Sequence, residues 1–188
     1  SAKQPMVIPL KLGLLDGKGR DLALKDAKGK PVPGNLIVLD KAAQKFVFGG
    51  VKEKPAIYCN RGFSAPVKLV TNFGEDNLLF LAKHDSDAFN RYDAVEQLSM
   101  QSLAASAQGA NAAPDALIEA LSNALDNAAL DDAFLAQLFS LPDESDIAQR
   151  IGKNIDPDAI LAARKKVKRD IGTALKDKLA ARYQALTS

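Results

Sequence analysis

Hydrophobic and polar positions alternate along the first half of the chain, as they do in half-buried strands. Ile8, Leu10, Leu12 and Leu14 occupy every second position, and the turn residues Asp16–Gly19 follow them. Because a period of two places such residues on one face of a pleated strand, we expect a strand here. Turn residues separate further apolar stretches, which predict strands at residues 21–24, 36–39, 45–48, 56–59, 67–73 and 78–82. About seven short strands favour an antiparallel β-sandwich.

After residue 85 the hydrophobic residues recur every three or four positions, which is the spacing of one helix face. Asp156-Pro157 is a strong start signal, with aspartate before the helix and proline at its first position. Because the five expected helices are joined by short segments, neighbours should be antiparallel, as in a stacked array. The sequence therefore predicts a β domain over residues 1–85, an immunoglobulin-like antiparallel sandwich, followed by an α domain over residues 86–188.

Composition and charge change near the same point. Residues 93–188 hold 22 alanines against 9 in residues 1–92, and alanine is the strongest helix former. Residues 1–92 carry 15 Lys and Arg against 9 Asp and Glu, whereas residues 93–188 carry 10 against 14. The whole chain has a net charge of only +2, so we expect no nucleic-acid partner. No apolar run approaches the roughly 20 residues of a membrane span, so we expect no membrane partner.

Residues 164–169 form a basic cluster, Arg-Lys-Lys-Val-Lys-Arg. Binding of a polyanion would need this charge to join a larger basic face or a stacking surface. The surrounding half is acidic and poor in aromatic residues. We therefore interpret the cluster as a solvated helix face with Val167 directed inward.

The scarcity of metal-binding residue types excludes several kinds of active site. The chain contains one histidine and one cysteine, so it cannot supply two histidine ligands, a cysteine-rich zinc site or an internal disulfide. Carboxylates of the second half stand mostly at helix starts and in loops, where capping is the simpler role: Asp126, Asp131, Asp132, Asp143, Glu144 and Asp146. We expect no catalytic residue, no metal ligand and no cofactor in this chain.

Three reactive residues allow two interpretations each. Ser64 lies in a segment close to the Gly-x-Ser-x-Gly nucleophile elbow, but Pro66 replaces the second glycine. His84 and Asp85 could form a general-base pair, or could cap or cross-link two domains. Cys59 could be a nucleophile or a small buried side chain. We favour the structural interpretation of all three.

Two segments, residues 61–69 and 79–92, resemble the bacterial aminopeptidase N family of zinc-dependent gluzincin aminopeptidases. The family typically has proline where Ala88 stands and tryptophan where Tyr92 stands. Similarity at residues 141–144 and 155–160 extends the resemblance over nearly the whole chain. We expect structural roles for the motif residues, with Phe63 in the sandwich core: Phe63, Ser64, Ala65, Pro66, His84, Phe89, Arg91 and Tyr92.

The resemblance implies that this chain is a non-catalytic fragment of a longer enzyme, called the parent below. In the family, a β-sandwich connects a thermolysin-like catalytic domain to a large helical domain that covers the active site. The zinc motif His-Glu-x-x-His and the Gly-x-Met-Glu-Asn segment belong to the catalytic domain, and neither occurs here. The implied role is that of a scaffold. Its partners would be the catalytic domain and the remaining helices, while zinc and peptide substrates belong to the parent.

An alternative is a free-standing module that binds a protein or peptide and has no enzymatic parent. The single cysteine and the lack of a visible leader lead us to expect a cytoplasmic location. An array of helices cut partway exposes apolar surface. We therefore expect the last helix, through Leu186, to support concentration-dependent self-association.

Overall fold

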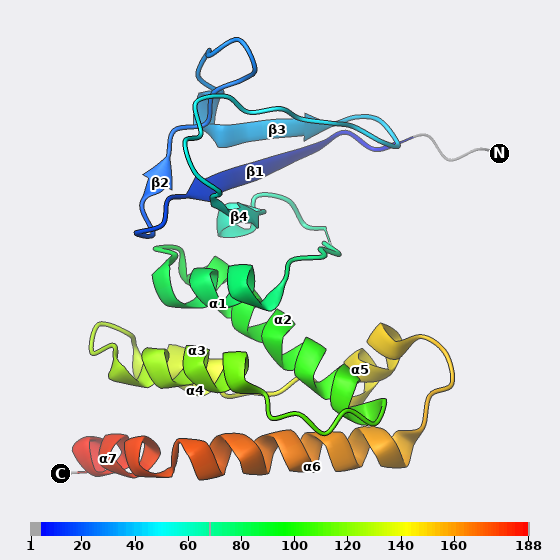
Figure 1. Ribbon diagram of the computed structural model, residues 1–188, viewed down its shortest axis with the longest axis vertical. Coiled ribbons are helices and arrows are strands. Elements are labelled where there is room, and N and C mark those ends of the chain that lie inside the picture. Colours follow the sequence, from blue (N-terminus) through cyan, green and yellow to red (C-terminus); the bar gives the residue numbers. More distant parts are fainter. Residues whose placement is uncertain (1–4, 68, 188) are drawn as a thin grey trace. The chain divides into compact units, whose positions relative to one another are not determined.

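The computed structural model describes residues 5–67 and 69–187. Its elements fall into two compact units, Ser1–Arg91 and Tyr92–Ser188, whose boundary lies within helix α2 (Ala88–Ala107). The first unit holds the strands and the second holds only helices, which confirms the predicted order of a β part followed by an α part (Figure 1). None of the helices in the described ranges combines the length and the apolar character that a membrane span requires.

Strand β1 (Ile8–Leu15) is the central strand of the first unit. It pairs antiparallel with β3 (Leu36–Leu39) along its first half. Along its second half it pairs antiparallel with β2 (Asp21–Leu22) and with β4 (Ala56–Cys59). The alternation of apolar residues at positions 8–14 therefore predicted this strand correctly.

Both faces of β1 are buried along its second half. Leu12 and Leu14 contact Leu24 in the core cluster of the unit. On the opposite face, a Cβ atom at Gly13 would come within 1.7 Å of the Cζ atom of Tyr58. Glycine is required at this position because the tyrosine ring fills the space of any side chain.

The segment predicted as a strand at residues 78–82 is helix α1 (Glu75–His84), so that prediction was wrong. Leu78, Leu81 and Ala82 are buried at helical spacing. Acidic residues in the first turn and basic residues in the last turn favour the helix dipole. A short apolar run fits a buried strand or a buried helix, and the run alone does not distinguish them.

Two other predicted strands do not form in the described part of the chain. Residues 45–48 contribute one isolated bridge, between Phe48 and Asp26. Residues 67 and 69–73 contain no strand, and Lys68 lies outside the described residues. Without a neighbouring strand to share backbone hydrogen bonds, alternating apolar residues do not make a strand. The described sheet has four strands where about seven were expected.

The second unit consists of helices joined by short loops: α2 from Tyr92 onward, α3 (Asp115–Asp126), α4 (Asp132–Leu138), α5 (Glu144–Ile151), α6 (Pro157–Ala174) and α7 (Lys176–Thr187). The side chains of Asp131, Asp143 and Asp156 accept hydrogen bonds from backbone N–H groups at the starts of α4, α5 and α6. These caps were predicted from the sequence.

The long last helix expected from the sequence is divided at Leu175 into α6 and α7. Helix α6 packs on α5, and α7 packs on α3 (Figure 1). Ion pairs join Arg164 of α6 to Glu144 at 2.8 Å and Lys178 of α7 to Asp126 at 2.5 Å. The apolar stripe of α6 is largely buried, whereas the end of α7 exposes Tyr183 and Leu186.

Candidate functional site

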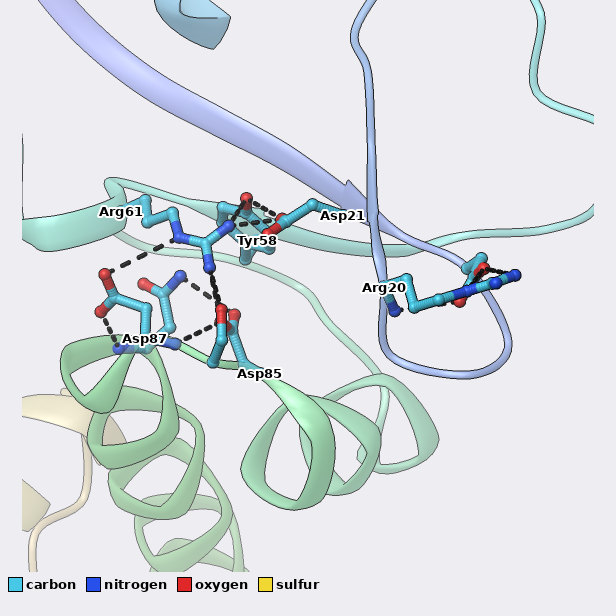
Figure 2. A network of polar contacts seen from close by, with 9 residues as sticks. Arg20, Asp21, Tyr58, Arg61, Asp85 and Asp87 are labelled. Carbon is cyan, nitrogen blue, oxygen red and sulfur yellow. Dashed lines mark hydrogen bonds and ion pairs between the residues drawn. The ribbon is translucent and has the colours of Figure 1, made fainter.

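Arg61 is the centre of a polar network in the first unit (Figure 2). Its guanidinium donates hydrogen bonds to Asp21 and to the Tyr58 hydroxyl. It also donates to Ser86 Oγ at 2.6 Å and to Asp85 Oδ1 at 3.4 Å. The guanidinium carbon lies 4.7 Å from the centroid of the Tyr58 ring, which adds a cation–π contact. One cation thus serves several acceptors.

Asp85 is the buried carboxylate of this network, with only 1% of the residue exposed. It accepts hydrogen bonds from the backbone N–H of Asp87 at 2.8 Å and from Asn90 Nδ2 at 3.1 Å. Burial raises the pKa of Asp85, while these hydrogen bonds and the charge of Arg61 oppose the rise. Asp87 in turn accepts the N–H of Asn90, so its side chain caps the start of α2.

The network joins segments that are far apart in the sequence. Asp21 begins β2, Tyr58 lies in β4, and Arg61 begins the 3-10 turn η2 (Arg61–Phe63) that follows β4. Asp85 and Asp87 lie between α1 and α2. Burial, with the hydrogen bond to Asp21, raises the pKa of Tyr58, so its hydroxyl stays protonated. This arrangement ties the sheet to the turn between the helices, and we assign it a structural role.

Ser64 belongs to a loop that Asn60 organises. Asn60 has a φ of 63°, and its side chain bonds both the N–H and the carbonyl of the buried Ala65, at 2.8 and 3.0 Å. The Ser64 hydroxyl donates to Asn60 Oδ1 at 3.0 Å and accepts from the backbone N–H of Lys11 at 2.8 Å. These contacts hold the loop against β1 and support the structural interpretation of Ser64. Pro66, which follows, is exposed.

His84 and Asp85 do not form the pair that general-base catalysis would need. The His84 ring packs against Phe80 with centroids 4.6 Å apart, and its Cβ lies close to Gly19. Burial, together with the charges of Lys83 and Arg91, lowers the pKa of His84. Asp85 instead bonds the groups described above. The structure therefore supports the structural interpretation of both residues.

The expectation that Phe63 fills the core is wrong, because 54% of the residue is exposed. Phe63 ends the turn η2 with a φ of 53°, so it lies outside any strand that would direct it inward. Its ring lies 5.4 Å from that of Phe89, centroid to centroid. Arg91 is buried and donates from Nε to the Ala82 carbonyl at 3.1 Å, and Tyr92 is hydrogen-bonded to Gln137.

Sequence reasoning missed Asp21 and Tyr58 as residues of the Arg61 network, and Asn60 as the residue that organises the Ser64 loop. No short motif contains them together, since Arg61 and Asp21 are 40 positions apart. The one available signal was asparagine at 60 directly before Arg61-Gly62, because asparagine tolerates positive φ better than other non-glycine residues. Cys59 is half-buried and packs against the core cluster, in agreement with its structural interpretation.

No metal-binding cluster is found in the described ranges, where no three His, Cys, Asp or Glu residues are grouped suitably. The basic cluster of α6 has Val167 buried, as predicted, and Lys166 pairs with Asp170 at 2.8 Å. A cavity of about 380 Å³ lies between α5 and the start of α6. It is lined by Glu144, Ser145, Ala148, Ile155, Pro157, Asp158, Ile160 and Leu161. The one lining hydroxyl, that of Ser145, donates to Asp143 Oδ1 at 2.8 Å, and this carboxylate is the N-cap of α5.

Several bacterial proteins are similar to this chain. It is 33% identical over 190 residues to aminopeptidase N of Escherichia coli (strain K12), covering 97% of the chain and 21% of that protein. It is 34% identical over 170 residues to aminopeptidase N of Caulobacter vibrioides, covering 89% of the chain and 18% of that protein. The chain therefore spans about a fifth of the length of these relatives.

The same fold occurs in a crystal structure of Legionella pneumophila aminopeptidase A in complex with aspartic acid. The TM-score is 0.72 at 22% identity, over 93% of this chain and 20% of that one. A domain of unknown function with an Ig-like fold, DUF3458, matches residues 1–72, which confirms the predicted class of the first part. Another with ARM repeats, DUF3458_C, matches residues 75–188. The second match covers more than half of the chain. The chain therefore belongs to the DUF3458_C family, and the Ig-like DUF3458 domain precedes the matched helices.

Proposed function

We propose that this chain is a non-catalytic scaffold within a zinc-dependent aminopeptidase that removes N-terminal residues from peptides. The observation that carries the proposal is the similarity to aminopeptidase N over 97% of the chain but only 21% of that protein. Within residues 5–67 and 69–187, no group of three His, Cys, Asp or Glu side chains fits a zinc site. We therefore assign zinc and the catalytic groups to parts of the parent outside these residues. We also propose that the parent is located in the cytoplasm.

The scaffold role means that the β part connects a catalytic domain to the helical part, which covers the active site. The Arg61 network supports this proposal because it fixes the sheet to the turn between α1 and α2, where the helical part begins. We propose residues 1–85 and 86–188 as the two domains, with the buried Asp85 at the junction. Limited proteolysis that releases two stable pieces cut between Lys83 and Asp87 would contradict a rigid junction.

An activity comparison tests the proposed function. The purified chain and the complete product of its gene, each assayed on an alanyl chromogenic peptide substrate, should differ: only the complete product should turn over, and a chelator should abolish that activity. Arg61→Met in the complete product should lower its thermal stability and leave kcat unchanged at temperatures where it is folded. Chelator-sensitive turnover by the purified chain would refute the proposal. A gene that encodes these residues alone would support the free-standing module instead.

A further inference from the structure

One face of the β1–β3 pair is apolar and exposed. The register places Pro9 opposite Val38 and Lys11 opposite Leu36, and opposite residues of an antiparallel pair project to the same face. Val7, directly before β1, continues this alternation. The exposed fractions are 68% for Val7, 41% for Leu36 and 44% for Val38. Val7, Pro9, Leu36 and Val38 are called the outer face below.

The opposite face of the same strand pair is the core side. Leu10 is buried, and its register partner Ile37 packs against the core cluster. When one face of an antiparallel sheet is buried, the other face normally carries polar side chains. The outer face instead carries three aliphatic residues and a proline. This composition is typical of a surface that another protein segment covers.

The outer face is also continuous with a buried surface. Odd-numbered residues of β1 project to the same side along the whole strand. Gly13 and Leu15, at its far end, are buried, and the Tyr58 ring lies across Gly13. The next odd-numbered residue, Lys11, is exposed, so this cover does not extend to it. The outer face is thus the uncovered part of a face that the rest of the unit buries.

We propose that the outer face docks a segment of the parent that lies outside these 188 residues. The inference rests on the proposed function. Relatives of this chain are about five times its length, so most of such a protein is available to cover the face. A stable dimer needs about 800 Å² from each partner, more than four partly exposed side chains supply. The docking segment should be apolar, with an acidic side chain facing Lys11.

Cysteine labelling tests this assignment. Cys59→Ser removes the one native thiol of these 188 residues, and Val38→Cys then places a thiol on the outer face, both in the 188-residue chain and in the complete gene product. Labelling of each engineered cysteine is followed on its own peptide by mass spectrometry, so other thiols of the complete product do not enter the comparison. A maleimide should label this thiol about tenfold more slowly in the complete product, because reaction needs access to the thiolate. Lys28→Cys, in the exposed turn between β2 and β3, is the matched control and should be labelled equally in both. Leu36→Cys repeats the test if Val38→Cys does not fold.

The outcomes separate the two proposals. Equal labelling of Val38→Cys in both proteins, with peptidase activity in the complete product, overturns the docking inference and leaves the proposed function intact. A complete product without peptidase activity overturns the proposed function. In the isolated chain, labelling of Val38→Cys that becomes slower as the protein concentration rises would assign the outer face to a second copy. That result also overturns the inference.

Discussion

Replacement of Arg61 by methionine should destabilise the first unit by about 3 kcal/mol. Methionine keeps an apolar stem over the Tyr58 ring but leaves the buried Asp85 without its cation. Loss of one member of a buried ion pair costs about 3–5 kcal/mol. We expect the lower end, because Asp85 keeps its hydrogen bonds from Asp87 and Asn90. The pair with Asp21 contributes little, because the Asp21 side chain is 47% exposed.

The loss should depend on pH in a defined direction. A carboxyl whose pKa is raised on folding stabilises the fold below its unfolded pKa, and this contribution is lost as pH rises through the folded pKa. Burial already raises the pKa of Asp85, and removal of the Arg61 charge should raise it further. The loss in the free energy of unfolding caused by Arg61→Met should therefore be largest at neutral pH. It should become smaller as acid protonates Asp85.

Urea unfolding followed by circular dichroism measures the loss, and amide exchange in β1 and β4 assigns it to the first unit. Asp85→Asn and the double variant Arg61→Met with Asp85→Asn complete a double-mutant cycle. The double variant should be more stable than Arg61→Met alone, because it contains no unpaired buried charge. A loss well under 1 kcal/mol, or a double variant no better than Arg61→Met, would refute the reasoning.

Three further changes test other parts of the structure. Gly13→Ala should cost about 3 kcal/mol in urea unfolding, because its Cβ overlaps the Tyr58 ring; wild-type stability would contradict this packing. Hydrogen bonds from Arg20 lower the pKa of Asp16 from 3.8 to about 2, so the stability from its ionised form is lost as pH falls through that range. Asp16→Asn should therefore reduce the fall in the free energy of unfolding between about pH 4 and pH 2. An unchanged fall would count against the pairing of Asp16 with Arg20. Sedimentation over a wide concentration range should show self-association that Leu186→Glu abolishes, and a monomer throughout would exclude it.

Local signals were predictable from the sequence, whereas contacts between distant segments were not. Strand β1 and the aspartate caps of α4, α5 and α6 depend on spacing within a few residues, so pattern alone found them. Helix α1 was taken for a strand because its apolar run fits both structures. The network around Arg61 gave no signal because its partners come from three separate segments that only the fold brings together.

The spread of the Arg61 network along the sequence affects how the chain folds during synthesis. Asp21 and Tyr58 emerge from the ribosome before or with Arg61, but Asp85 follows Arg61 by 24 residues. At ordinary translation rates of about 5–20 residues per second, this delay lasts roughly 1–5 s. During that interval β4 lacks its contacts with α1, and Arg61 lacks its buried carboxylate. We expect the nascent sheet to be most open to chaperones or to misfolding in these few seconds, until the turn between α1 and α2 has been made.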